Sequence, residues 1–181
     1  MTAKNIFRLD GKVALITGGS RGLGLRMAQA LGEMGCKIAI SARKPDELGV
    51  AKEFLRSHDI PALGVANDLQ NSGDIPTLID KIVENLGPID ILVNNAGTTW
   101  SAPAEDYPDE AWQKVMNLNV NAPFYLSREV ARRCMIPRRK GKIITIASTA
   151  GLKGMGPGVH TVAYNTSKAA AINLTRALAG C

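Results

Sequence analysis

The chain has 181 residues, of which 45% are hydrophobic and 21% are charged, and its formal net charge is +6. This length fits one domain, because a single hydrophobic core commonly closes at about 100 to 200 residues. No apolar run approaches the roughly 18 to 20 residues that span a bilayer, and the start lacks a secretory signal, so we expect a soluble, cytoplasmic protein without membrane partners.

Short β-branched runs alternate with longer amphipathic stretches along the whole chain. The first part predicts strands and helices in turn at 12–17, 22–35, 37–41, 46–58 and 61–66. The second part predicts a helix at 75–87, a strand at 89–95, a long helix at 109–134, a strand at 142–148 and a last helix from Tyr164 onward. Five apolar strands separated by helices indicate a parallel sheet covered on both sides. Because crossovers are right-handed, we predict an α/β doubly wound parallel sheet, the Rossmann fold.

A glycine-rich turn follows the first predicted strand directly. Its sequence TGGSRGLG places Gly18, Gly22 and Gly24 between the strand and the next helix. Glycine lets a phosphate approach the backbone N–H groups of a helix N-terminus, where the dipole and the unpaired donors favour an anion. Such a turn alone could be an ordinary tight turn. Its place inside a strand–helix–strand unit favours a dinucleotide pyrophosphate site.

The end of the second predicted strand, AISARK, bears on which dinucleotide binds. NAD-selective sites place an acidic residue there for the ribose 2′-hydroxyl, whereas an Arg accommodates a 2′-phosphate. The acidic position is Ala42 here, Arg43 follows it, and Arg21 lies within the glycine turn. Two guanidiniums converging on one place, with no carboxylate to repel a phosphate, favour NADP over NAD. The alternative is that both arginines are surface charges.

Cysteines and basic residues argue against other classes of function. The three cysteines, Cys36, Cys134 and Cys181, are widely separated and odd in number, so we expect reduced thiols and no metal site. Six basic residues gather in RRCMIPRRKGK, at positions 132, 133, 138, 139, 140 and 142. No nucleic-acid motif accompanies them, so a solvated helix end is favoured over a polyanion site, and we expect no nucleic-acid partner.

Tyr164 and Lys168 form a Tyr-x-x-x-Lys pair whose side chains share one face of the last predicted helix. With TGGSRGLG and the NNAG at 94–97, in this order, the sequence resembles the short-chain dehydrogenase/reductase family over essentially the whole chain. It is most similar to 3-oxoacyl carrier-protein reductases and to sugar or gluconate dehydrogenases. The resemblance implies an NADP-dependent oxidoreductase that moves a hydride between nicotinamide and a ketone or secondary alcohol.

The resemblance implies catalytic roles for four residues. Tyr164 matches the family's acid/base, and the ammonium of Lys168 would stabilise its phenolate and bind the nicotinamide ribose. Ser148, which ends the predicted strand IITIAS, matches the serine that hydrogen-bonds the reacting oxygen. Asn119 in WQKVMNLNV matches the asparagine of the proton relay, although two other asparagines lie nearby. Taken singly, such a Ser or Asn could equally be a turn or capping residue.

The resemblance also implies a cofactor site and an assembly. Asp68 in NDL would receive the adenine amino group, and NNAG would pack around the adenosine side of the cofactor. The implied cofactor-binding residues are Gly18, Ser20, Arg21, Gly22, Leu23, Gly24, Arg43, Asp68, Leu69, Asn95, Ala96, Gly97, Tyr164 and Lys168. Thr99 and Trp100 are candidates for the pocket of a small carbonyl or alcohol substrate, with plain packing as the alternative. A homo-oligomer would form through the last two long helices.

The chain departs from the family pattern in two places. The segment between Ser148 and Tyr164 is longer than usual and glycine-rich, which predicts a bulged loop at the pocket mouth. The family's sixth and seventh strands, Pro-Gly turn and substrate loop are absent, so we expect residues 1–181 to be one domain, incomplete at its C-terminus. Its fifth strand would then be a sheet edge. The alternative to an active enzyme is a catalytically impaired form that binds dinucleotide or pairs with a full-length relative.

Overall fold

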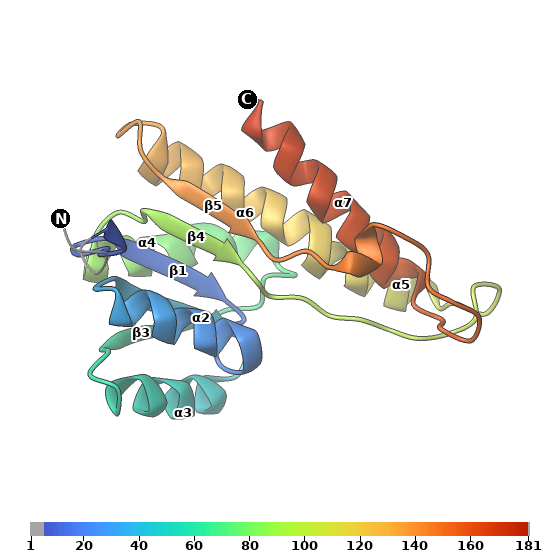
Figure 1. Cartoon of the computed structure of the whole chain (residues 1–181), viewed down its shortest axis with the longest axis horizontal. Coiled ribbons are helices and arrows are strands. Elements are labelled where there is room, and N and C mark those ends of the chain that lie inside the picture. Colours follow the sequence, from blue (N-terminus) through green and yellow to red (C-terminus); the bar gives the residue numbers. More distant parts are fainter. Residues whose placement is uncertain (1–5, 181) are drawn as a thin grey trace.

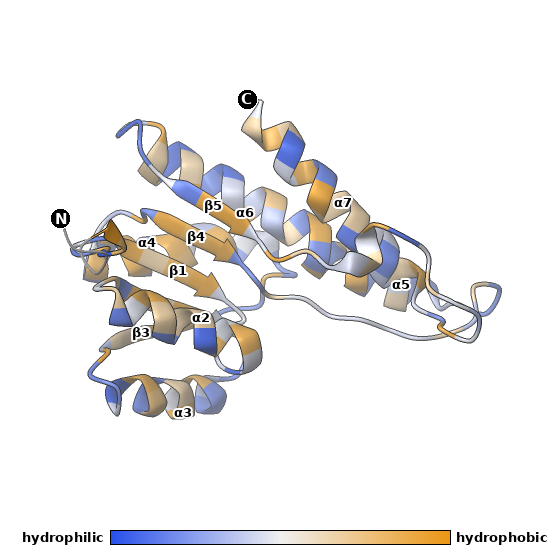
Figure 2. Ribbon diagram, in the orientation of Figure 1, coloured by the Kyte–Doolittle hydropathy of each residue, from blue (hydrophilic) through white to orange (hydrophobic). Residues whose placement is uncertain are grey.

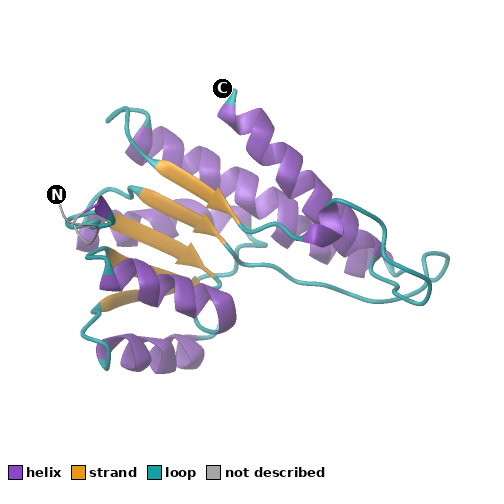
Figure 3. Cartoon of the chain, in the orientation of Figure 1, coloured by secondary structure: helices purple, strands orange, loops and turns teal. Residues whose placement is uncertain are grey.

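The chain forms a five-stranded parallel sheet with helices on both faces in the computed structural model, which describes residues 6–180 (Figure 1 and Figure 3). The strands are β1 (Val13–Thr17), β2 (Lys37–Ala42), β3 (Ala62–Ala66), β4 (Ile91–Asn94) and β5 (Lys142–Thr145). Their spatial order is β3-β2-β1-β4-β5 and every pair is parallel. The chain therefore builds outward from β1 in one direction and then in the other, and the predicted doubly wound sheet is confirmed.

Two hydrophobic layers hold the helices against the sheet. The helices α2 (Gly22–Glu33) and α3 (Pro45–Arg56) cover one face, and α4 (Ile75–Leu86) and α6 (Ala122–Val130) cover the other. Successive residues of a strand point to opposite faces, so Leu15 packs with α4 and α6 while Ile16 packs with α2 and α3. In Figure 2 the strands are apolar and the helices carry hydrophilic residues on their outer sides. This two-layer cover explains why β1 is an uninterrupted apolar run.

The predicted long helix at 109–134 is present but contains two π-helical turns. It consists of α5 (Asp109–Met116), η2 (Asn117–Asn121), α6 and η3 (Ala131–Met135). Pro123 has no N–H to donate to the carbonyl of Asn119, four residues back, so the regular α-helical pattern cannot pass through this turn. Sequence periodicity predicted the helix and did not reveal this local change in its winding.

The prediction for the fifth strand was too long at its carboxyl end. The N–H of Ile146 donates to the carbonyl of Asn94, 2.9 Å away, and β4 ends at Asn94. Beyond this point the chain has no strand to pair with, and it enters the short 3-10 helix η4 (Thr149–Gly151). Ser148 is therefore the residue that caps η4, not the last residue of a strand. Within the described residues β5 pairs only with β4, as expected of a sheet edge, and Ile144 is 45% exposed.

The last helix, α7 (Val162–Ala179), carries Tyr164 and packs against η4 and α5. The predicted bulged loop precedes it and extends away from the sheet beside the segment that follows β4 (Figure 1). The N–H of Ala102 joins these two segments by donating to the carbonyl of His160, 3.1 Å away. None of the helices in residues 6–180 is long and apolar enough to cross a membrane.

The basic segment at 132–142 lies at the end of the sheet opposite the glycine turn, and its six basic residues are exposed, in agreement with the predicted solvated helix end. Arg133 pairs with Asp80 of α4. Arg138 pairs with Asp90, 3.0 Å away, and also donates to the carbonyl of Ile89. These guanidiniums lie against carboxylates of neighbouring elements, which the sequence spacing did not reveal. Cys36 and Cys134 are buried free thiols, and Cys181 lies outside the described residues.

Candidate active site

Two cavities adjoin at the carboxyl ends of the strands. The glycine-turn cavity, of about 290 Å³, is lined by the segments that follow β1, β2, β3 and β4. The Tyr164 cavity, of about 900 Å³, is lined by residues from the segments 97–99, 146–161 and α7, together with Leu23. Asn95 and Gly97 line both. Open parallel sheets bind ligands at this edge, so the two cavities together are the candidate active site.

The glycine turn brings backbone donors close to the first cavity. Gly18 has φ +62°, and a Cβ there would lie 3.0 Å from the Cα of Ala96. A Cβ on Gly24 would collide with the carbonyl oxygen of Gly18, so glycine is required where α2 meets the turn. Arg21 precedes α2 in extended conformation without a side-chain cap, which leaves the first N–H groups of the helix to other acceptors. The local geometry suits an anion at this helix end.

A hydrogen-bond network fixes the two central strand ends beside the glycine turn. The hydroxyl of Thr17 accepts from the N–H groups of Asn95 and Ala96, each 3.0 Å away. The Asn95 side chain in turn donates to the carbonyls of Thr17 and Gly18, at 2.9 and 3.3 Å. Thr17 was missed by sequence reasoning, and its only signal is a polar residue at the end of an apolar strand. The NNAG segment thus positions the turn as well as lining both cavities.

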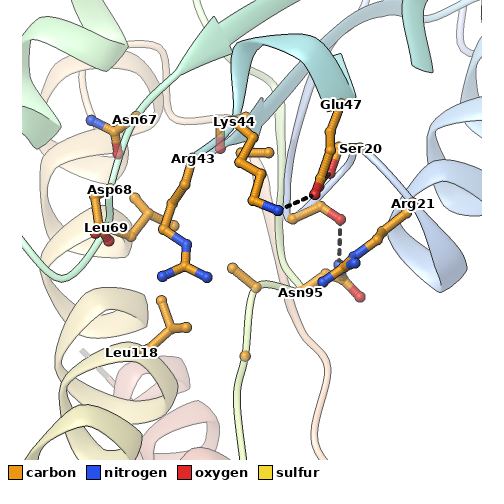
Figure 4. A pocket seen from close by; sticks show the side chains of 15 residues that line it. Ser20, Arg21, Arg43, Lys44, Glu47, Asn67, Asp68, Leu69, Asn95 and Leu118 are labelled. Carbon is orange, nitrogen blue, oxygen red and sulfur yellow. Dashed lines mark hydrogen bonds and ion pairs between the residues drawn. The ribbon is translucent and has the colours of Figure 1, made fainter. Parts of the chain in front are cut away.

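Charged side chains from three segments gather in the glycine-turn cavity. Arg21 and Arg43 extend toward it from different elements, and Lys44 and Asp68 also line it (Figure 4). Two buried polar atoms that belong to its lining residues, Ser41 Oγ and Asn67 Oδ1, have no hydrogen-bond partner among the described residues. Such unpaired buried atoms are uncommon, and they provide polar contacts for a bound molecule.

A second carboxylate, in addition to Asp68, lines this cavity next to Lys44, so the expectation that no carboxylate there would repel a phosphate was wrong. Glu47 comes from the first turn of α3, and its side chain accepts from the hydroxyl of Ser20 at 3.2 Å. The ammonium of Lys44 lies 3.1 Å from its other oxygen. This contact with Lys44, with smaller effects from Ser20 and Arg21, lowers the pKa of Glu47. Sequence reasoning missed it because the residue reaches the cavity only once α3 folds back over β2.

Three of the four predicted catalytic residues, Ser148, Tyr164 and Lys168, line the Tyr164 cavity. They meet because η4 packs tightly onto α7 next to Lys168. A Cβ on Gly151 would lie only 2.5 Å from the carbonyl carbon of Lys168 and 2.6 Å from the N of Ala169. Gly151 is therefore needed for the approach that unites Ser148 with the Tyr-Lys pair, and sequence reasoning missed it.

Lys168 is held inside the protein close to the tyrosine ring. It is only 7% exposed, and its Nζ donates to the carbonyl of Ile146 at 2.6 Å. The same Nζ lies 5.7 Å from the centroid of the Tyr164 ring. Burial lowers the pKa of Lys168, because the charged form loses its contact with water. A cation in this position acts on Tyr164 with little screening by solvent.

The side chain of Asn119 lines neither cavity and is instead a structural centre beside them. It is 3% exposed, accepts from the N–H of Thr98 and donates to the Thr98 carbonyl, both at 2.8 Å. It also donates to the hydroxyl of Ser167, 2.9 Å away, which itself donates to the carbonyl of Tyr164 at 2.8 Å. This network joins η2, the segment after β4 and α7. Ser167 is a further residue that sequence reasoning missed.

The two candidate substrate residues have different places. Thr99 lines the Tyr164 cavity, whereas Trp100 lies outside both cavities and is 44% exposed. The Trp100 carbonyl accepts from the hydroxyl of Tyr107 at 3.3 Å, and the Nζ of Lys114 lies 5.9 Å from its ring centroid. The packing alternative thus describes Trp100 better than a place in the pocket.

Known proteins agree with this architecture. Residues 12–180 match the family described as short chain dehydrogenase. Gluconate 5-dehydrogenase of Gluconobacter oxydans is 35% identical over 179 residues, which cover 99% of this chain and 68% of that protein. The rhamnolipids biosynthesis 3-oxoacyl acyl-carrier-protein reductase of Pseudomonas aeruginosa is 38% identical over 177 residues, which cover 96% of this chain and 68% of that protein.

A solved structure shares the fold closely. The crystal structure of a gluconate 5-dehydrogenase from Burkholderia cenocepacia in complex with NADP and tartrate has a TM-score of 0.90 and 34% identity. The match covers 99% of this chain and 69% of that one. The chain therefore spans about two thirds of the length of these relatives.

Proposed function

Because the chain belongs to the short-chain dehydrogenase/reductase family, whose members interconvert CH–OH and C=O groups with NAD(P), we propose that it is an NADP-dependent oxidoreductase for a ketone or secondary alcohol. The observation that carries this proposal is that Ser148, Tyr164 and Lys168 line one cavity, which adjoins the glycine-turn cavity. A dinucleotide that extends from the glycine turn past Asn95 and Gly97 would reach the tyrosine.

The residues around the glycine turn fit a dinucleotide. We propose that the turn, with Gly18, Gly22 and Gly24, and the open N-terminus of α2 bind the pyrophosphate. Asp68 would accept from the adenine amino group, Asn95 and Gly97 line both cavities, and Leu23 lines the Tyr164 cavity. The unpaired Ser41 Oγ and Asn67 Oδ1 add polar partners on the adenosine side. The full proposed set is Gly18, Ser20, Arg21, Gly22, Leu23, Gly24, Arg43, Asp68, Leu69, Asn95, Ala96, Gly97, Tyr164 and Lys168.

The preference for NADP rests on the two arginines. Arg21 and Arg43 both line the glycine-turn cavity, and a guanidinium can bind a phosphate through two parallel hydrogen bonds. The acidic residue that would bind a 2′-hydroxyl is replaced by Ala42 at the end of β2. The similar gluconate 5-dehydrogenase structure that contains NADP gives this proposal further support.

The chain's own residues would transfer the proton. The nicotinamide supplies or accepts the hydride when it is bound. In reduction the hydroxyl of Tyr164 gives its proton to the carbonyl oxygen, and in oxidation the phenolate takes the proton from the alcohol. The buried ammonium of Lys168 stabilises the phenolate, and the hydroxyl of Ser148 holds the reacting oxygen by a hydrogen bond.

Asn119 would act through its backbone and through its position. Pro123 provides no N–H for the Asn119 carbonyl in the helical pattern, so we propose that this carbonyl is the group that serves the proton relay. The side chain is hydrogen-bonded to Thr98 and Ser167, and so it would fix η2 relative to the segment after β4 and to α7.

The lining of the Tyr164 cavity bears on the substrate. Its charged side chains are Lys153 and Lys168, and among the described residues no Asp or Glu lines it. This favours neutral or anionic substrates, in line with the sugar-acid and acyl substrates in the names of the relatives. Members of the family typically form oligomers, and we propose that this chain does so through its last two long helices, the one that runs from α5 to η3 and α7.

The test is NADPH oxidation with a panel of keto acids, ketoses and 3-oxoacyl thioesters, and NADH serves as the comparison cofactor. We expect turnover with NADPH and a loss of about 10²- to 10⁴-fold in Tyr164→Phe, because a positioned acid contributes about that much. Equal rates in both proteins would refute the role of Tyr164. Calorimetric binding of NADPH without turnover of any substrate would instead favour the alternative that the chain only binds the dinucleotide.

A further inference from the structure

Glu47 occupies donors that a phosphate in the glycine-turn cavity would use. Its carboxylate accepts from Ser20 and pairs with Lys44, and both of those residues line the cavity with it (Figure 4). The side chains of Arg21 and Arg43 make no hydrogen bond or ion pair within residues 6–180. The cavity therefore contains two guanidiniums without a hydrogen bond, of which Arg21 lies close enough to Glu47 to help lower its pKa, and a hydroxyl and an ammonium that already contact the Glu47 carboxylate.

We propose that Glu47 is a specificity-determining residue that competes with the 2′-phosphate of the cofactor and limits the preference for NADP over NAD. This inference rests on the proposed function, because it takes the glycine-turn cavity as the site of the adenosine 2′-phosphate. A ribose phosphate carries a charge of about −1.5 to −2 near neutral pH. It has to displace Glu47 from Ser20 and Lys44, or bind beside a like charge, and a 2′-hydroxyl faces neither obstacle.

The first turn of α3 offers a different explanation for Glu47, and also the control that separates the two. A carboxylate near a helix N-terminus is favoured by the helix dipole whatever the cavity binds. Asp46 lies in the same first turn and carries the same charge, but it does not line the cavity. Neutralising Asp46 changes the helix terminus alone, whereas neutralising Glu47 changes the helix terminus and the cavity.

The experiment compares two nucleotides that differ only in the 2′-phosphate and undergo no hydride transfer. Isothermal titration calorimetry at one fixed, low ionic strength measures 2′,5′-ADP and 5′-AMP binding to the wild-type chain, Glu47→Gln and Asp46→Asn. We expect Glu47→Gln to bind 2′,5′-ADP about two- to fivefold more tightly, because exposed charge pairs contribute up to about 1 kcal/mol, and 5′-AMP within about twofold of wild type. Asp46→Asn should bind both nucleotides within about twofold of wild type.

The outcomes distinguish the inference from the proposed function. Unchanged or weaker binding of 2′,5′-ADP by Glu47→Gln overturns the inference, because Glu47 then does not compete. A parallel change for both nucleotides, or the same gain in Asp46→Asn, overturns it as well. A wild-type chain that binds 2′,5′-ADP no more tightly than 5′-AMP refutes the proposed phosphate site itself. Preferential binding of 2′,5′-ADP by wild type, with no gain in Glu47→Gln, leaves the proposed function standing and removes only the role of Glu47.

Discussion

The two adjoining cavities hold their polar groups in opposite ways. In the glycine-turn cavity, Arg21, Arg43 and Lys44 are partly or fully exposed, and two buried polar atoms lack partners in the described part of the chain. In the Tyr164 cavity, Lys168 is bonded to a backbone carbonyl, and beside it Asn119 and Ser167 have all but lost contact with water. The charged side chains of the first cavity are free to contact a bound anion, whereas the polar side chains of the second are fixed by burial and hydrogen bonds.

The difference follows from where the residues come from. The charged lining of the glycine-turn cavity comes from short turns after neighbouring strands, within residues 18–69. The Tyr164 cavity is assembled from segments far apart in sequence, joined through Asn119, Gly151 and Ser167. Substitutions at these three residues should therefore disturb catalysis while leaving the binding of the adenosine half of the cofactor intact.

The largest effect is expected from Gly151→Ala. The added Cβ would meet the backbone at Lys168, so η4 must move away from α7 and carry Ser148 with it. A shift of about 1 Å at a reacting group can cost about 10²-fold in rate, and overpacking costs about 1–3 kcal/mol in stability. We expect a loss of turnover with NADPH of about that size, with 2′,5′-ADP affinity unchanged by calorimetry.

Gly154→Ala is the matched control for Gly151→Ala. Gly154 lies three residues further on, in the loop that follows η4, where a Cβ would meet nothing within 4 Å. Its turnover should stay close to that of wild type. A similar loss in both variants would mean that the whole segment from η4 to this loop tolerates no alanine, and the close approach at Gly151 would not be the cause.

Asn119→Ala is expected to come next, and to act mainly on stability. Removing the amide leaves the partly buried N–H and C=O of Thr98 without their partners. The buried hydroxyl of Ser167 loses its donor but keeps its hydrogen bond to the carbonyl of Tyr164. Each unsatisfied buried group costs about 1–3 kcal/mol. We expect the free energy of unfolding, measured with urea, to fall by about 3 kcal/mol, and turnover to fall with it.

Asn121→Ala provides the comparison for Asn119→Ala within the same π-helical turn. Asn121 is exposed, and within residues 6–180 its side chain donates only to Asn117. Its loss should change the free energy of unfolding by less than about 0.5 kcal/mol. If the two variants were equally destabilised, the turn itself would be the sensitive feature and the bonds of the Asn119 side chain would not.

Sequence patterns predicted what depends on local order, and missed what depends on packing between distant segments. The apolar runs predicted the strands because β1 and β4 are buried on both faces, and the glycine turn was recognisable from its place after β1. The end of β5 was misplaced because it depends on where β4 stops. Glu47 could not be found because it matters through Ser20, which is distant in sequence. Gly151 could not be found because it matters through the backbone of Lys168, which the fold brings close.

The smallest expected effect concerns the buried charge of Lys168. Its pKa in the folded chain is lowered from the ordinary value of 10.5 because burial disfavours the ammonium, so the native state binds fewer protons than the unfolded state between the two pKa values. Stability therefore rises with pH in this window, and the penalty for burying the charge is fully present below it.

Lys168→Met removes the titrating group. The free energy of unfolding of wild type minus that of Lys168→Met should increase as the pH approaches 10.5. Urea titrations of both proteins, made with Tyr164→Phe in each so that the neighbouring phenol does not titrate, measure this difference. A difference that stays constant or decreases over the same range would show that Lys168 is not held as a desolvated cation. The two cavities would then not differ in how strongly their charged groups are desolvated.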